Sequence, residues 1–342
     1  MQETKNARTI PDYRNLPKNN MDHNETIVKK IKVGISSCLL GERVRFDAGH
    51  KRNAYITDTL GLYFDFFPLC PEAAAGMGIP RPPIHLQQLQ GKTRAIHVQH
   101  PELDVTEPLQ TIAQRMLSTL PEDLCAYILK KDSPSCGMER VKVYSEHGKH
   151  APAERIGTGI FAAALKEHYP HLPLEEEGRL GDPVLRENFI QRVYVYHRWK
   201  QLLLTGFSAQ AFIDFHARHK YIIMAHDQTG LRQLGQIVAQ TGTADLNMLR
   251  QQYLQLLMQL LSKRASRGQH TNVLQHLLGY LRKDLDKDDR EELLATIAEY
   301  QRGYVPLIVP ITLLKHHFRR HPNPYILQQH YLNPHPSELM IA

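Results

Sequence analysis

The chain is poor in cysteine, with four in 342 residues. So few cysteines do not make the disulfide scaffold of a small secreted domain. We therefore expect reduced thiols and a cytoplasmic protein, in which cysteine serves metal binding or catalysis rather than bridging.

Long apolar runs are also missing. No stretch approaches the roughly 20 residues that a membrane-spanning helix needs. Residues 1–28 are polar and lack the apolar core of a signal peptide, so we interpret them as a disordered lead-in. What remains is typical of a soluble globular protein, with 42% hydrophobic and 23% charged residues.

Three of the four cysteines lie just beyond short apolar runs that read as strands. The runs begin at Lys32, Tyr63 and Ala126, and the cysteines that follow them are Cys38, Cys70 and Cys136. If these strands are parallel in one sheet, all three thiols emerge at its carboxyl edge, where open α/β sheets bind their ligands. The pattern therefore predicts a binding site formed by the three thiols at this edge of the sheet.

The spacing of these cysteines is weak evidence by itself, because it matches no C-x-x-C pattern of zinc or ferredoxin sites. On spacing alone, two of the three are ordinary buried thiols. Their common position after strands favours a site for soft metals, either zinc or an iron–sulfur cluster. Cys125 stands at the start of the third strand, on the opposite edge of the sheet, and is interpreted as a small core residue.

Two polar residues accompany the thiols. Glu72 is two positions after Cys70 and is a candidate general base for water, although a surface or helix-start acid is the commoner role of a glutamate. Ser133, three positions before Cys136, is a candidate for hydrogen bonding to a substrate. The alternative for Ser133 is a simple turn residue before Pro134.

The first half alternates strands and helices. We expect helices over 47–60, 104–117 and 159–168, and an ordered loop over 81–86. This βαβ alternation predicts an α/β domain over residues 29–178, with a parallel, Rossmann-like sheet.

The second half, residues 179–342, reads as an all-α domain. Asp182 followed by Pro183 is a typical helix start, and strand signals are absent from there on. The expected helices include 184–204, 208–224, 246–261, 273–281 and 288–302, with an extended segment from 303 that continues as a helix.

Charge is distributed unevenly between the halves. Residues 1–178 hold 22 Lys and Arg against 22 Asp and Glu, so the net charge of +7 belongs to residues 179–342. The excess indicates either a surface for a polyanion or a solvated basic face without a partner. The candidate phosphate contacts are Arg192, Arg198, Lys200, Arg218, Lys220, Lys263, Arg264 and Arg267.

Three segments of the first half resemble the motifs of the thiouracil desulfidase family. They are Gly34–Gly41, Pro68–Glu72 and Lys131–Gly137, each with its cysteine. The resemblance implies that the three cysteines bind a [4Fe-4S] cluster with one open iron, which acts as a Lewis acid on a thiolated pyrimidine. It also implies that Glu72 activates water and Ser133 orients the substrate in a non-redox reaction.

The second half resembles the helical module often fused to that domain, at His216–Tyr221, Gly303–Pro310 and Tyr331–Leu339. The two-domain form is similar to bacterial desulfidases that convert 4-thiouridine in tRNA to uridine. This resemblance implies tRNA as the partner, in agreement with the charge of the helical half. A metal pair at His216 and His219 lacks a third ligand, so packing or phosphate contact is favoured.

Three functions stay open at this point. The first is a tRNA 4-thiouridine desulfidase, and the second is a desulfidase for free thiouracil or thionucleotides. The third is a non-catalytic zinc or cluster protein that binds RNA. Metal content separates the third from the others, and substrate preference separates the first two.

Overall fold

The computed structural model describes residues 30–148 and 152–341. Residues 31–342 form one compact unit. The predicted lead-in over residues 1–28 lies outside the described ranges. The described residues contain no helix that is long and apolar enough to span a membrane.

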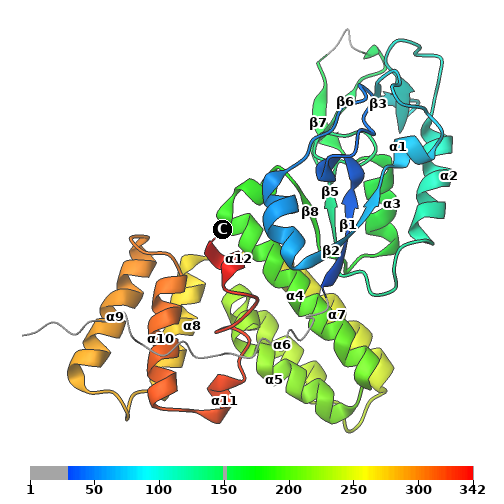
Figure 1. Cartoon of the computed structure of the whole chain (residues 1–342). Coiled ribbons are helices and arrows are strands. Elements are labelled where there is room, and N and C mark those ends of the chain that lie inside the picture. The colour runs from blue at the N-terminus through cyan, green and yellow to red at the C-terminus, as the bar shows by residue number, and fades with distance from the viewer. Residues whose placement is uncertain (1–29, 149–151, 342) are drawn as a thin grey trace, which may run out of the picture. The chain divides into compact units, whose positions relative to one another are not determined.

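A four-stranded parallel sheet forms the centre of the first half (Figure 1). Its strands are β1 (Ile31–Ser36), β2 (Phe64–Leu69), β5 (Ala126–Leu129) and β8 (Leu174–Glu176). The order is β2-β1-β5-β8, and every neighbouring pair is parallel. The predicted α/β fold with a parallel sheet is confirmed.

The strands differ in burial according to their place in the sheet. All four residues of β5 are buried, because β5 lies between β1 and β8. β2, in contrast, is an edge strand, and of its residues only Phe64 is fully buried.

Helices accompany this sheet as the alternation predicts. α2 (Thr106–Leu117) and α3 (Ile160–His168) follow the predicted ranges closely and pack against each other. α2 buries Ala113, Met116 and Leu117 in the same core as the sheet, as expected for an amphipathic helix.

A second, mixed sheet was not expected. It has the order β4-β3-β6-β7 and consists of β3 (Ile84–Leu89), β4 (Lys92–His97), β6 (Val141–Tyr144) and β7 (Glu154–Gly157). The predicted loop over 81–86 is therefore wrong from Ile84 onward. A two-residue turn joins β3 to β4, and both of its residues, Gln90 and Gly91, have positive φ, as tight hairpins require.

The predicted helix over 47–60 is also wrong in its first part. Residues up to Asn53 form a loop, followed by a π-helical turn (Tyr55–Thr59) and a 3-10 turn (Leu60–Leu62). Ala48 has a φ of +55°, and the Asp47 carboxylate accepts a hydrogen bond from the Gly49 amide at 3.0 Å. This local bond stabilises a turn in place of a helix.

Residues 179–341 contain helices and no strand. The predicted start is confirmed: Pro183 is the first helical residue, and the Asp182 carboxylate accepts hydrogen bonds from the Val184 and Leu185 amides. The helices are α4 (Pro183–Thr205), α5 (Ala209–His226), α6 (Gln228–Val238), α7 (Leu246–Ser262), α8 (Arg267–Tyr280), α9 (Lys287–Arg302), α10 (Ile308–Arg320), α11 (Pro324–Leu327) and α12 (Glu338–Ile341).

One hydrophobic core runs through both halves. It includes β1 and β5 as well as Trp199, which stacks on Tyr253 with 5.5 Å between ring centroids. α4 is the connection, since Tyr194 contacts Phe64 of β2 at 6.3 Å between centroids. The domain boundary near residue 179 stays a prediction. Truncation of the chain at that position would divide the shared hydrophobic core.

Candidate active site

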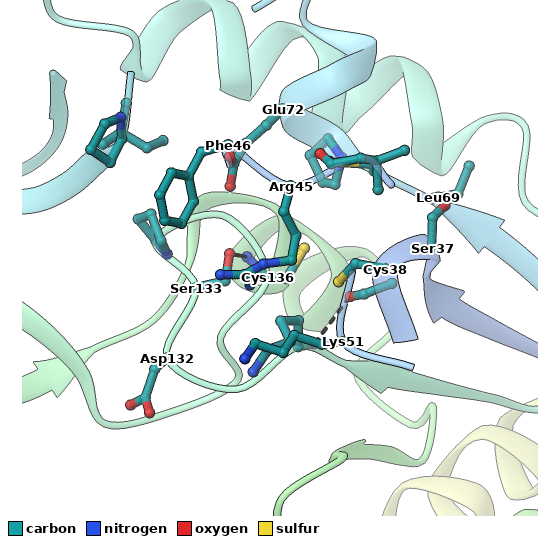
Figure 2. A pocket seen from close by; sticks show the side chains of 18 of the residues that line it. Ser37, Cys38, Arg45, Phe46, Lys51, Leu69, Glu72, Asp132, Ser133 and Cys136 are labelled. Atoms are coloured by element: carbon teal, nitrogen blue, oxygen red, sulfur yellow. Dashed lines mark hydrogen bonds between the residues drawn. The ribbon is translucent and has the colours of Figure 1, made fainter. Parts of the chain in front are cut away.

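Three thiols, each in the segment that follows a strand, line one cavity at the carboxyl edge of the parallel sheet. Figure 2 labels two of them, Cys38 and Cys136. Cys38 lies on a 3-10 turn directly after β1, and Cys70 directly precedes the short helix α1 (Pro71–Ala74) after β2. Cys136 lies in the loop after β5. The cavity has a volume of about 350 Å³. The sequence pattern correctly placed the three thiols together.

Close backbone packing holds the Cys136 loop against α3. A side chain at Gly159, just before α3, would lie 2.5 Å from the Ser135 carbonyl carbon. A side chain at Gly137 would lie 2.8 Å from the Ser133 carbonyl oxygen. Only glycine permits this approach, so the loop that presents Cys136 has a fixed position.

The Glu72 carboxylate lies at the same cavity and is held from both sides. Arg81 donates to Oε2 from Nε at 3.0 Å and from Nη2 at 2.8 Å. Ser135 Oγ donates to Oε1 at 2.8 Å. The Glu72 side chain is 14% exposed and that of Arg81 only 2%. A carboxylate with fixed orientation and a remaining exposed edge is suited to accept a proton from water.

Ser133 lines the cavity and also stabilises the loop. Its Oγ accepts hydrogen bonds from the Ser135 amide at 3.2 Å and from the Cys136 amide at 3.1 Å. The turn role considered for Ser133 is thus observed. Because both bonds use the oxygen as acceptor, its hydroxyl hydrogen is still available to donate to a ligand.

Arg81 is the functional residue that the sequence did not reveal. It lies in a stretch rich in glycine and proline, where no periodicity marks a lone arginine as buried. Besides Glu72, it donates to the carbonyl oxygens of Gly78 at 3.0 Å and Val44 at 2.9 Å. It therefore joins three segments around the cavity.

The environment of the three thiols disfavours their charged form. Burial, and then the neighbouring Cys70, raises the pKa of the Cys38 thiol to about 11. Burial also raises the pKa of Cys70, and it raises the pKa of Cys136 well above the usual range for a thiol. Three thiolates here repel one another, and a bound cationic group would stabilise all three.

The first half of the chain is similar to known desulfidases. Residues 33–177 match the family model described as 2-thiouracil desulfurase. A solved structure, that of the [4Fe-4S]-dependent thiouracil desulfidase TudS, is 30% identical and covers 45% of this chain and 95% of TudS, with a TM-score of 0.37. The chain belongs to the thiouracil desulfidase family.

The chain also matches a second family model and a curated relative. Residues 220–336 match a family model described as a protein of unknown function, DUF1722. The uncharacterized protein YbgA of Escherichia coli (strain K12) is 36% identical over 141 residues, which are 41% of this chain and 83% of YbgA.

The thiols around the cavity can be compared with the ligands that metal sites require. In residues 30–148 and 152–341, no group of three or more His, Cys, Asp or Glu side chains is placed to hold one metal ion. Thiolates on a four-iron cluster bind separate irons and stand farther apart than the ligands of one ion. Three thiols around one cavity, two of them buried, have the number and softness for such a cluster.

Cys125 lies apart from this cavity, as expected. It is buried, and its thiol donates to the Asp123 carbonyl oxygen at 3.2 Å and lies 3.6 Å from His197 Nδ1. Burial raises its pKa to about 12. Cys125 therefore behaves as a core residue.

The basic residues predicted to contact RNA fall into two groups. Three of them lie on α4 and are half-buried. Arg198 donates to the Pro334 carbonyl oxygen, Lys200 donates to the carbonyl oxygens of Glu122 and Leu124, and burial lowers the pKa of Arg192. The other five have no ion pair with another described residue and are Arg218, Lys220, Lys263, Arg264 and Arg267.

The two histidines considered as a metal pair are occupied by packing. His219 is buried and its Nδ1 lies 2.7 Å from the Phe215 carbonyl oxygen. His216 Nδ1 lies 3.1 Å from the Tyr253 hydroxyl. These contacts favour the packing role that the sequence suggested.

Proposed function

We propose that the protein is a desulfidase that converts 4-thiouridine in tRNA to uridine and hydrosulfide. Cys38, Cys70 and Cys136 would bind a [4Fe-4S] cluster and leave one iron open. The observation that carries this proposal is the meeting of three thiols from separate strands with one oriented carboxylate at a single cavity. Family membership supports it.

When bound, the cluster would supply an open Lewis-acid site that polarises the thiocarbonyl group of the substrate. Glu72 accepts a proton from a water molecule, whose oxygen attacks the ring carbon bearing sulfur. The hydrogen bonds from Arg81 and Ser135 keep the carboxylate oriented during this step. Ser133 donates its hydroxyl hydrogen to the pyrimidine and holds the ring in place.

The products balance without an electron donor. A carbon–oxygen bond forms, the carbon–sulfur bond breaks, and sulfur leaves with a proton as hydrosulfide. The ring keeps the oxidation state that it had in the thiocarbonyl form. The reaction is therefore a hydrolysis, and the protein's tasks are binding, orientation and proton transfer.

The helical half would bind the tRNA backbone. The exposed residues Arg218, Lys263, Arg264 and Arg267 have no ion pair with another described residue, which leaves them free to neutralise phosphates. A thiolated base must leave its stack to enter the cavity, at a cost of a few kcal/mol. Phosphate contacts offset that cost.

A second candidate is a desulfidase for free thiouracil or thionucleotides. The family description and the name of TudS mention thiouracil and no RNA. In that case the helices would serve folding or assembly.

The test compares the two substrate classes. Full-length protein with reconstituted cluster is incubated without oxygen with thiolated tRNA or free 4-thiouracil, and hydrosulfide release is measured. We expect a higher kcat/KM for tRNA, and one that falls with added salt. Release from free thiouracil with no release from tRNA would establish the second candidate.

A further inference from the structure

A cavity within the helical half lies apart from the three thiols. Its volume is about 460 Å³, which is in the range of small-molecule sites. Its walls are α4, α5 and His330, which lies in the segment after α11. It shares no lining residue with the desulfidase cavity.

The wall formed by the segment after α11 is fixed to α5 by hydrogen bonds. The His330 amide donates to the Arg218 carbonyl oxygen at 3.0 Å. The Gln329 side chain donates from Nε2 to the Ala217 carbonyl oxygen at 2.9 Å. The side chains that line the cavity therefore have defined positions relative to one another.

His219 contributes a buried acceptor without a donor. Its side chain lines the cavity and is 1% exposed. Its Nδ1 lies 2.7 Å from the Phe215 carbonyl oxygen, so Nδ1 carries the hydrogen and Nε2 of the neutral ring is an acceptor. Nε2 has no hydrogen-bond partner among the described residues. A buried polar atom without a partner is costly, which favours a ligand that donates a hydrogen.

Arg198 contributes a positive charge without a counter-ion. It is half-buried and lines the same cavity. Its Nη2 donates to the Pro334 carbonyl oxygen, whereas its Nη1 has no partner within the described part of the chain. Burial lowers the pKa of Arg198 to about 10, and of the described residues only Tyr194, which is not a carboxylate, raises it. A buried cation of this kind favours an anionic ligand.

The other titratable groups near His219 leave the cavity positive. They are Arg218, Asp214, His197, His216 and His330. Arg218 and Asp214 are both exposed, so their charges offset each other at the solvent side. Burial lowers the pKa of His216 and of His330 to about 4, so both rings are neutral at pH 7.

These groups together require a ligand that carries both a negative charge and a proton. A carboxylate or a phosphate diester has acceptor oxygens only. A phosphate monoester loses its second proton near pH 6, so close to neutral pH it offers charged oxygens to arginine and one proton to a histidine nitrogen. The backbone of RNA consists of diesters and lacks that proton, so an RNA strand offers this chemistry only at a terminal phosphate.

We propose that this cavity binds a phosphate monoester, held by Arg198 and Arg218 and by one proton shared between the phosphate and His219 Nε2. The remaining volume accommodates the organic group of the ester. The site is separate from the desulfidase cavity, and its test does not depend on the proposed function.

The test compares two probes that differ in this proton. Methyl phosphate, a monoester, and dimethyl phosphate, a diester, are titrated into full-length, cluster-loaded protein by calorimetry between pH 6.5 and pH 8. At pH 6.5 we expect methyl phosphate to bind about tenfold or more tightly, as a charged hydrogen bond supplies. Its affinity should fall by up to about tenfold per pH unit, because the dianion binds together with one proton.

A pair of RNA probes identifies the source of the monoester. One short unstructured RNA is prepared with a 5′-phosphate and with a 5′-hydroxyl group. A preference for the 5′-phosphate form at least as large as the preference for methyl phosphate assigns the site to an RNA end. Equal affinity for the two RNA forms, with methyl phosphate bound, assigns it to a small phosphorylated molecule.

Matched variants locate the bound phosphate. His219→Phe keeps an aromatic ring and removes the acceptor, so it should abolish the preference for methyl phosphate. His216→Phe changes a histidine of the same helix outside the cavity lining and should retain the preference. Arg218→Gln, at an exposed position that folding tolerates, should weaken methyl phosphate about tenfold. Arg232→Gln, at an exposed arginine of α6 outside the lining, should not.

Equal affinity for methyl phosphate and dimethyl phosphate in the unmodified protein would overturn the inference. An affinity for methyl phosphate that does not change between pH 6.5 and pH 8 would do the same, because no proton would then be bound with it. A preference retained in both His219→Phe and Arg218→Gln would place the phosphate elsewhere and would also overturn it.

Discussion

At the scale of single residues, the cavity combines groups that are costly to keep together without a ligand. Three neighbouring thiols disfavour one another's ionisation. A carboxylate lies at the same cavity, and Arg81 pairs with its charge. A metal that deprotonates the thiols would remove the conflict. The roles of these residues are therefore separable by substitution.

Substitution of Cys125 is expected to have a different effect from substitution of the other three cysteines. Cys38→Ser, Cys70→Ser and Cys136→Ser should each lose the cluster and the activity, because each removes one of only three thiolate ligands. Cys125→Ser is the matched control and should retain both, since its thiol lies away from the cavity. Iron content and hydrosulfide release measure the two effects. Loss of the cluster in Cys125→Ser, with retention in one of the other three, would refute the assignment.

Glu72→Gln separates proton transfer from cluster binding. The amide keeps the size of the side chain and still accepts the Ser135 hydrogen bond, so the cluster should be retained. Turnover should fall by about 10²- to 10⁴-fold, the contribution of a general base. Iron content and kcat are measured on the same sample. Near-normal kcat would reduce Glu72 to a structural role.

At the scale of elements, the regular parts of the site were predictable and its loops were not. Each of the three cysteines closely follows an apolar strand in the sequence. The positions of β1, β2 and β5 were therefore enough to predict that the thiols lie together. In the loop after Gly41, the sequence predicted a helix that begins at Asp47. Its carboxylate instead caps a turn at Gly49, and the contacts that hold this loop come from Arg81, more than 30 positions away.

The same limit applies to the basic residues of α4. Charge counts cannot distinguish a lysine that faces solvent from one that binds carbonyl oxygens of another element. Lys200 binds the carbonyl oxygens of Glu122 at 2.6 Å and Leu124 at 2.8 Å. The structure therefore assigns it to the contact between α4 and the segment before β5.

Substitution of Lys200 should affect stability rather than RNA binding. Lys200→Met removes two charge-assisted hydrogen bonds and should lower the free energy of unfolding by about 1–3 kcal/mol. The salt dependence of tRNA affinity should not change. Denaturant unfolding and binding titrations at several salt concentrations measure the two effects.

The comparison variant is Lys263→Gln, Arg264→Gln, at exposed positions after α7. It should leave the unfolding free energy nearly unchanged. It should reduce the slope of log affinity against log salt by about 0.7–0.9 per charge removed. An unchanged salt slope in the Lys263→Gln, Arg264→Gln variant, together with a reduced slope in Lys200→Met, would contradict this account. It would mean that Lys200 contacts RNA and that Lys263 and Arg264 do not.

At the scale of the whole molecule, one core joins the sheet to the helices. A truncation near residue 179 would expose that core, so experiments on the helical half are best done on the full chain. The helical half also holds four neutral histidines that are buried or half-buried. Burial lowers the pKa of each to about 4, and they are His216, His226, His270 and His330.

These histidines predict a loss of stability in acid. Between about pH 6.5 and pH 4 the unfolded chain binds protons that the folded chain does not, so the free energy of unfolding falls as the pH falls through this range. Burial raises the pKa of Glu175 and Glu176, and this shift makes the free energy of unfolding rise as the pH falls. Only two carboxyl groups contribute to that rise, whereas four histidines contribute to the loss. Urea unfolding at pH 7, 5.5 and 4.5 measures the change. Constant stability over these pH values would contradict the burial of neutral histidines.

The most direct test of the central claim is the iron and acid-labile sulfide content of the full-length protein purified without oxygen. The account predicts about four iron and about four sulfide per chain, lost in Cys136→Ser and retained in Cys125→Ser. Stoichiometric zinc without sulfide, bound through the same three cysteines, would contradict it.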